Sequence, residues 1–197
     1  CQDPLDYVVH IDLTSRCLFQ EDFIDKISSF KKAERSSART QSLVENGSQT
    51  KGNIFQLDGH DLTGIETIIR AEVEKFRSNF SEKNQGLIRN WPTEYTVYGW
   101  LVSMTSGGRI RPHIHDEGWL SGSIYINVPS DIPSDDGNLV VCLGDEADSC
   151  ASALDTCRSL NVVSGSMVMF PSSLTHFTTP FESSEERVVL AFDIRSR

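Results

Sequence analysis

The sequence has 197 residues, of which 38% are hydrophobic and 23% are charged, a balance typical of a folded globular protein rather than a disordered or fibrous one. Its 18 lysine and arginine residues are outnumbered by 28 aspartate and glutamate residues, which gives a formal net charge of −10, so we expect no nucleic-acid partner. No apolar run approaches the roughly 18 residues that a membrane-spanning helix needs, so we expect no membrane partner either.

The N-terminus and the cysteines suggest a compartment. The sequence begins with Cys1 rather than methionine, and no secretory signal follows, so we expect a piece of a longer polypeptide with a cytoplasmic location. The five cysteines form no CxxC pair, and reduced thiols are the main expectation. A bridge between Cys150 and Cys157, which flank a short polar loop, is the alternative.

The first half of the sequence predicts two amphipathic helices, because apolar residues recur there every three or four positions. The first helix would bury Phe19, Phe23, Ile24, Ile27 and Phe30. The second, near residues 64–80, would bury Ile65, Ile68, Ile69, Val73, Phe76 and Phe80. Between them, the polar stretch from Lys31 to Gln49 is interpreted as a surface loop, and Asn53 to Leu57 as a short strand.

The second half predicts strands, because short β-branched or aromatic runs alternate with turns rich in glycine, proline, serine and aspartate. These runs are Tyr95 to Met104, Leu120 to Val128, Asn138 to Leu143, Ser166 to Phe170 and Arg187 to Ile194. The stretch from Ala147 to Ser159 is interpreted as an irregular excursion between strands. Helices followed by strands without intervening helices favour an antiparallel barrel or double sheet with helices supporting one side.

Three histidines lie beside these strands and are candidate metal ligands. In an extended segment, side chains two positions apart share a face, so His113 and His115 can point toward one site. A distant third ligand such as His176 would complete a facial set with open positions, as non-heme iron(II) oxygenases require. Arg187 opens the last apolar strand, and it needs an anionic partner there, such as a dicarboxylate co-substrate or the neighbouring Glu185 or Glu186.

These residues are part of a longer motif. The motif comprises Gly99-Trp100-Leu101-Val102, His113-Ile114-His115, Gly118-Trp119-Leu120-Ser121-Gly122, Tyr125-Ile126-Asn127-Val128-Pro129, Gly137-Asn138-Leu139, Phe170-Pro171-Ser172, His176 and Arg187. Over roughly residues 50 to 195 the sequence resembles the 2-oxoglutarate/Fe(II)-dependent dioxygenases, and within them a family related to prolyl hydroxylases. The resemblance implies a mainly β fold with supporting helices, the double-stranded β-helix (jelly roll, cupin-like). Residues 1–50 would then be an N-terminal extension and helix packed on the core, and residues 51–197 the oxygenase domain.

The resemblance also implies cofactors and site residues. Fe(II) would be held by His113, His115 and His176. A second assignment replaces His113 by Glu117, with Asp116 anchoring a ligand imidazole, because the superfamily's usual pattern has a carboxylate two residues after the first histidine.

The co-substrate 2-oxoglutarate would be bound by Arg187 and the hydroxyl of Tyr125, although Tyr125 could instead be a core aromatic residue. Trp100 and Trp119 are candidates for the walls of the site. The site would open between the loop after Met104 and the segment from Phe170 to His176.

The reaction implied is hydroxylation of an unidentified small-molecule or peptide substrate, with release of succinate and CO2. The alternative is a non-catalytic, cupin-like module that binds a metal or small ligand and is attached to a repeat protein.

Overall fold

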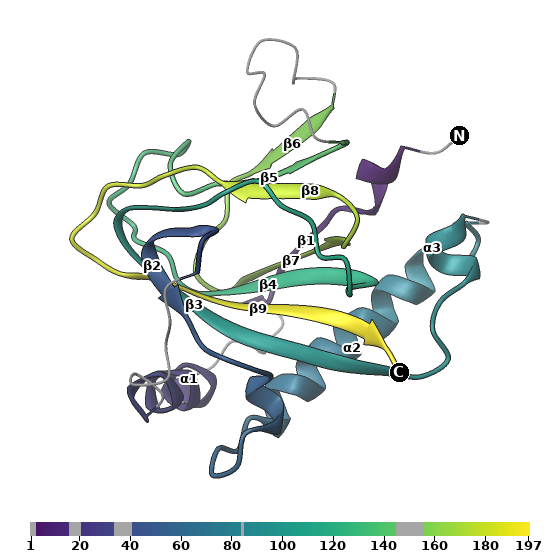
Figure 1. Ribbon diagram of the computed structural model, residues 1–197, viewed down its shortest axis with the longest axis horizontal. Helices are drawn as coiled ribbons and strands as arrows, with labels where there is room; N and C mark the ends of the chain where they lie inside the picture. Colours follow the sequence, from purple (N-terminus) through teal and green to yellow (C-terminus); the bar gives the residue numbers. More distant parts are fainter. Residues whose placement is uncertain (1–2, 16–20, 34–40, 84, 145–155) are drawn as a thin grey trace.

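The computed structural model describes residues 3–15, 21–33, 41–83, 85–144 and 156–197, which form two antiparallel sheets (Figure 1). The larger sheet has the strand order β1-β7-β4-β9-β3-β2, and the smaller has the order β6-β5-β8. The strands are β1 (Val9–Asp12), β2 (Val44–Gln49), β3 (Tyr95–Ile110), β4 (Leu120–Asn127), β5 (Leu139–Cys142), β6 (Cys157–Leu160), β7 (Ser166–Pro171), β8 (Thr175–Thr178) and β9 (Arg187–Ser196). The predicted double-sheet fold is confirmed.

Both faces of the larger sheet are buried, because successive side chains of its strands point in opposite directions. On β9, Leu190 belongs to an apolar cluster shared with the helices, whereas Val189 belongs to a second cluster shared with the smaller sheet. The same alternation on β4 separates Ile124 from Tyr125. The second cluster therefore fills the space between the sheets, where a site can be enclosed.

Helices cover the other face of the larger sheet. They are α1 (Glu21–Ala33), α2 (Thr63–Asn79) and α3 (Gly86–Arg89). The 3₁₀ turns are η1 (Pro4–Tyr7) and η3 (Ile54–Gln56), and Leu5 of η1 belongs to the second cluster, between the sheets. As Figure 1 shows, α2 runs along this sheet on the side away from the smaller one. Its buried residues, among them Ile69 and Val73, lie in the same cluster as Leu101 and Ile194 of the sheet, which confirms the expected packing. In α1, Phe23, Ile27 and Phe30 are buried as expected. Phe19 lies outside the described residues.

Two predictions for residues 31–57 are wrong. Val44–Gln49 is not loop but the edge strand β2, and the sequence conceals it because most of its side chains are polar and only half-buried. The expected strand at Asn53 to Leu57 is the turn η3. The buried Asn53 side chain accepts from the backbone N–H of Phe55 and donates to the carbonyl of Val97, and these bonds fix a turn there.

Two boundaries also differ from expectation. Strand β3 continues beyond Met104 to Ile110, because β2 pairs with its far end, so the loop that borders the histidines starts later than expected. Residues 157–159, expected to be irregular, belong to β6 and pair with β5. Of the rest of that excursion, Thr156 lies in a turn, and residues 147–155 lie outside the described residues.

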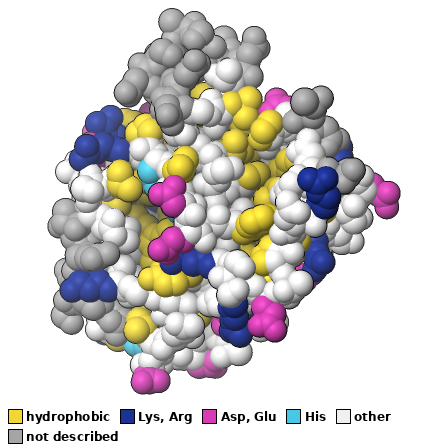
Figure 2. Space-filling view, turned by 45° about the vertical axis from the view of Figure 1, so that its right-hand side comes forward, with side chains coloured by type: hydrophobic (Ala, Val, Ile, Leu, Met, Phe, Trp, Pro, Cys, Tyr) yellow, Lys and Arg dark blue, Asp and Glu magenta, His cyan; other side chains and the backbone are white. Residues whose placement is uncertain are grey.

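The N-terminal 50 residues contribute to the main sheet. β1 pairs with β7 at one edge, and β2 pairs with β3 at the other. The division of the chain at residue 50 remains a prediction. None of the described helices is both long and apolar enough to cross a membrane. On the face shown in Figure 2, acidic and basic side chains are scattered among hydrophobic ones rather than gathered into one patch.

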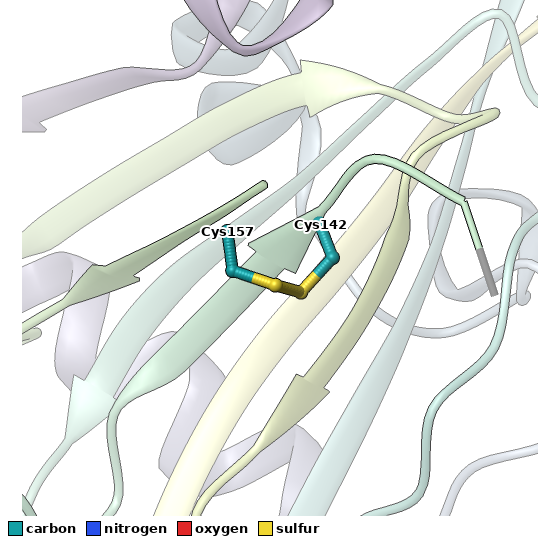
Figure 3. Close-up of a disulfide and its surroundings, with 2 residues drawn as sticks. All are labelled: Cys142 and Cys157. Carbon is teal, nitrogen blue, oxygen red and sulfur yellow. A yellow bond between two sulfur atoms is a disulfide. The ribbon is translucent and has the colours of Figure 1, made fainter. Parts of the chain in front are cut away.

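A disulfide joins Cys142 at the end of β5 to Cys157 at the start of β6 (Figure 3). The expectation of reduced thiols is therefore wrong for these two residues. The alternative, a bridge between Cys150 and Cys157, is also wrong, since Cys157 is bonded to Cys142. The reason is the strand register, which places these two residues directly opposite each other. Disulfides persist mainly in oxidising compartments, so this pairing speaks against the cytoplasmic location, which remains a prediction.

Removing this disulfide should destabilise the smaller sheet. The bridge closes a segment with a sequence separation of 15, and a loop of that size corresponds to about 3 kcal/mol of stabilisation. We expect Cys157→Ser to lower the free energy of unfolding by about 2–4 kcal/mol in urea titrations. A thiol reductant should lower the stability of the parent protein by a similar amount and leave Cys142→Ser/Cys157→Ser unchanged. Equal stability of parent and variant would show that the bridge does not form.

Candidate metal centre

Three histidines converge between the sheets. His113, His115 and His176 each offer a ring nitrogen, and these three atoms lie within 4.8 Å of one another. The Nε2 atoms of His113 and His115 are 3.0 Å apart, and the rings of His113 and His176 are centred 4.2 Å apart. The predicted grouping of these three residues is therefore present in the fold, although His176 follows His115 by 61 residues and His113 by 63 in the sequence.

Backbone pairing brings the histidines together. His113 and His176 form an isolated antiparallel bridge, in which each backbone N–H donates to the carbonyl of the other residue, at 3.2 and 3.0 Å. The N–H of His115 donates to the carbonyl of Ser172 at 3.1 Å. The segment carrying His113 and His115 is thus attached along the smaller sheet, and the extended backbone places both rings on one side.

The hydrogen bonds of the rings define which nitrogen faces the centre. In His113, Nδ1 lies 2.8 Å from the carbonyl of Arg111, and in His176, Nδ1 lies 3.1 Å from the carbonyl of Leu174. In His115, Nδ1 lies 2.6 Å from the carboxylate of Asp193. Carbonyl and carboxylate oxygens only accept, so each Nδ1 carries the proton and each Nε2 presents a lone pair. The Nε2 atoms of His113 and His115 are 3.0 Å apart, and their lone pairs repel each other unless a cation lies between them. The donor set therefore fits a divalent transition metal such as iron(II).

A pocket of about 550 Å³ adjoins the histidines and contains a buried arginine. Arg187, at the start of β9, is 0% exposed, and burial lowers its pKa. One of its amino groups donates to the carbonyl of Gly137, while Nε and Nη2 have no hydrogen-bond partner among the described residues. Glu186 is paired with Lys31 instead. A buried guanidinium with free donors is a receptor for an anion.

Two residues shape the surroundings of this arginine. Tyr125 of β4 is fully buried, with its ring centre 5.4 Å from the guanidinium carbon, and burial raises the pKa of its phenol to about 12. It therefore stays neutral and keeps its O–H as a donor. Gly137 has a φ of +64°, and a Cβ there would lie 2.5 Å from Nη1 of Arg187. Both the turn and the close approach of the arginine require glycine at this position.

The other predicted site residues differ in their positions relative to the histidines. Glu117, the alternative ligand, is 74% exposed and paired with Arg195, and it is not part of the histidine cluster. Asp116 lines the pocket, but the carboxylate that contacts a ligand imidazole is Asp193. Trp100 lines the pocket, with its ring centre 5.4 Å from that of His115. Trp119, in contrast, packs against the helical cluster and donates to the carbonyl of Leu87, so the expectation that it walls the site is wrong.

Asp193 is a residue of the site that local sequence patterns do not reveal. It lies on β9 between Phe192 and Ile194, and only 1% of its surface is exposed. Its one visible signal is an acidic residue within an otherwise apolar strand, which must find a buried partner. The identity of that partner depends on the pairing of β4 with β9 and cannot be read from local spacing.

Stability of the metal-free protein should fall in mild acid. Burial, followed by repulsion from His113 and His115, holds the pKa of His176 well below its ordinary value of 6.5. Below about pH 6.5 this histidine therefore binds a proton in the unfolded chain but not in the folded chain. Its contribution to the free energy of unfolding is fully present above that pH and is lost as the pH falls. The slope cannot exceed about 1.4 kcal/mol per pH unit for one group. Urea titrations of chelator-treated protein should show this slope, and His176→Gln should reduce it; an unchanged slope would contradict this assignment.

The part of the chain that carries this site is similar to known proteins. Residues 98–193 match a family model described as "Putative 2OG-Fe(II) oxygenase". This range contains all three histidines, Tyr125 and Arg187. No curated protein matches the chain by sequence.

Solved structures share the fold at low sequence identity. A prolyl-4-hydroxylase from Pseudomonas putida is 17% identical with a TM-score of 0.63, covering 99% of this chain and 96% of its own. A prolyl hydroxylase from Trichoplax adhaerens, in complex with a peptide fragment of hypoxia inducible factor, is 11% identical with a TM-score of 0.62, covering 98% and 86%. HygX from Streptomyces hygroscopicus, with nickel and 2-oxoglutarate bound, is 12% identical with a TM-score of 0.58, covering 98% and 84%. The part of the chain that carries the histidines and Arg187 is thus similar to 2OG-Fe(II) oxygenases, and the chain as a whole shares its fold with solved prolyl hydroxylases.

Proposed function

We propose that the protein is an Fe(II)- and 2-oxoglutarate-dependent dioxygenase that hydroxylates a substrate and releases succinate and CO2. The observation that carries this proposal is one pocket that holds both three converging imidazoles and a buried arginine for which the described residues supply no acidic partner. Bound iron and 2-oxoglutarate would together supply the activated oxygen, and the protein's part is to bind, orient and exclude water.

Each pocket residue then has a defined task. His113, His115 and His176 would hold the metal through Nε2, since their Nδ1 atoms are occupied by oxygen acceptors. Arg187 would bind the carboxylate of 2-oxoglutarate that lies away from the metal, using the free Nε and Nη2 donors. The hydroxyl of Tyr125 would donate to the same carboxylate. The apolar side chains between the sheets would keep bulk water from this charge pair, which strengthens it.

The substrate would bind at the outer part of the pocket. Tyr98 and Trp100 lie there with ring centres 6.1 Å apart, and Asp116 and Glu117 supply acidic groups. Among proteins of this fold, the one from Trichoplax adhaerens was solved with a peptide fragment and HygX with hygromycin B. We propose a small-molecule or peptide substrate for this chain also, bound against these aromatic and acidic side chains.

The experiment that tests the proposal measures succinate formed from 2-oxoglutarate in air. We expect formation that needs both Fe(II) and the protein, rises when a cell extract supplies substrate, and is absent from His176→Ala. Tight binding of metal and 2-oxoglutarate without any succinate, with and without extract, would instead support a non-catalytic binding module.

A further inference from the structure

We propose that Asp193 is a positioning residue that orients His115 for the metal and places beside it the negative charge that a carboxylate ligand would otherwise supply. This inference rests on the proposed metal centre. It concerns how a site with three neutral ligands is completed by a fourth residue that does not touch the metal.

Both oxygens of the Asp193 carboxylate accept hydrogen bonds, one of them from His115. Oδ1 accepts from Nδ1 of His115 at 2.6 Å and from the hydroxyl of Ser121 at 2.8 Å, and Oδ2 accepts from Nη2 of Arg195 at 3.2 Å. The distance to His115 is typical of a charge-assisted hydrogen bond. Only 1% of the surface of Asp193 is exposed, so solvent weakens this interaction little.

The packing around Asp193 leaves little freedom to the pair. The hydroxyl of Ser121 also lies 2.8 Å from that of Ser172 and 3.0 Å from Nδ1 of His115. A Cβ on Gly118 would lie 2.4 Å from Oγ of Ser172 and 3.3 Å from Cγ of Asp193, so the chain can pass here only as glycine. The loop that carries His115 thus packs closely against the carboxylate of Asp193, and the imidazole of His115 is held with Nε2 toward the other two histidines.

The three histidines differ in the charge of their acceptors. Nδ1 of His113 and of His176 faces a neutral backbone carbonyl, and only His115 faces a carboxylate. Three neutral imidazoles leave the full charge of a divalent metal uncompensated, whereas a carboxylate ligand would cancel one unit. Arg195 offsets the charge of Asp193 only in part, because it also pairs with the carboxylate of Glu117. Asp193 therefore supplies the missing negative charge through one ring.

The test uses a substitution that removes the charge and keeps the shape. Asp193→Asn retains an oxygen acceptor for Nδ1, and we expect its Fe(II) affinity, measured anaerobically by calorimetry, to fall about 10- to 100-fold. We also expect its electron paramagnetic resonance spectrum with Fe(II) and nitric oxide to differ from that of the parent, which loss of stability alone would not produce. Glu72→Gln is the matched control, because Glu72 is an equally buried carboxylate on α2, outside the pocket.

The outcomes separate the two proposals. If Asp193→Asn binds Fe(II) as tightly as the parent and Glu72→Gln, with an unchanged spectrum, the role of Asp193 is refuted and the proposed function stands. If the parent itself binds no Fe(II), the proposed function fails and this inference fails with it. Should Asp193→Asn not fold, nuclear magnetic resonance of the Zn(II)-loaded parent gives the answer. The proton of His115 is expected on Nδ1, and a proton on Nε2 would overturn the proposal.

Discussion

Replacing His176 with alanine should abolish tight Fe(II) binding. His176 is the most deeply buried of the three histidines, and no carboxylate oxygen of the described residues joins their cluster to take its place. Loss of a residue that only orients a ligand costs about 10- to 100-fold in metal affinity, so loss of a ligand itself should exceed about 100-fold. Anaerobic calorimetry should give one Fe(II) per parent chain and no measurable binding to the variant.

Glu117→Ala is the matched comparison and decides between the two ligand assignments. Glu117 is exposed and paired with Arg195, and an exposed ion pair contributes about 1 kcal/mol or less, so Fe(II) affinity should fall less than about fivefold. A large loss in this variant would make Glu117 a ligand. Stoichiometric, tight iron in His176→Ala would end the proposal of a facial histidine site altogether.

Replacing Arg187 should weaken 2-oxoglutarate binding far more than metal binding. Its guanidinium is buried and keeps two donors free, so a bound carboxylate would be its main anionic partner. Removal of one partner of a desolvated charge pair costs about 2–5 kcal/mol, which corresponds to roughly 30-fold to several thousand-fold in affinity. Calorimetry with 2-oxoglutarate on the metal-loaded Arg187→Ala protein should show this loss, while the Fe(II) affinity of the variant stays within about threefold of the parent value.

Two controls accompany this measurement. Arg109→Ala removes an exposed arginine of β3 that pairs with Glu45 outside the pocket, and it should bind 2-oxoglutarate as the parent does. Arg187→Met keeps much of the buried volume without the charge, and it should lose affinity as Arg187→Ala does. Parent-like binding of 2-oxoglutarate by both Arg187 variants would show that this arginine has only a structural role.

Much of the site could be predicted because its residues carry local signals. The spacing of His113 and His115 places both rings on one side of an extended segment, and the structure shows their Nε2 atoms together. Arg187 was recognisable because a charge at the start of an apolar strand requires a partner. The buried strands β5 and β7 are also predictable, because burial on both faces requires an apolar composition that is visible in the sequence.

What the sequence concealed depends on contacts between distant segments. Asp193 lies 78 residues from His115, and the two meet through contacts between segments that are distant in the sequence, among them the pairing of β9 with β4. The disulfide follows from the register of β5 and β6, which places Cys142 opposite Cys157. Strand β2 forms because the edge of β3 offers backbone partners, so its own polar side chains give no sign of it.

The central claim, that one pocket binds Fe(II) and 2-oxoglutarate in direct contact, is tested most directly by visible absorption under anaerobic conditions. Addition of 2-oxoglutarate to the Fe(II)-loaded protein should produce a weak metal-to-ligand charge-transfer band, because the band requires chelation of the metal by the co-substrate. The band should be missing from His176→Ala, and in Arg187→Ala it should appear only at much higher 2-oxoglutarate concentrations. No band in the parent protein at saturating Fe(II) and 2-oxoglutarate would contradict the account.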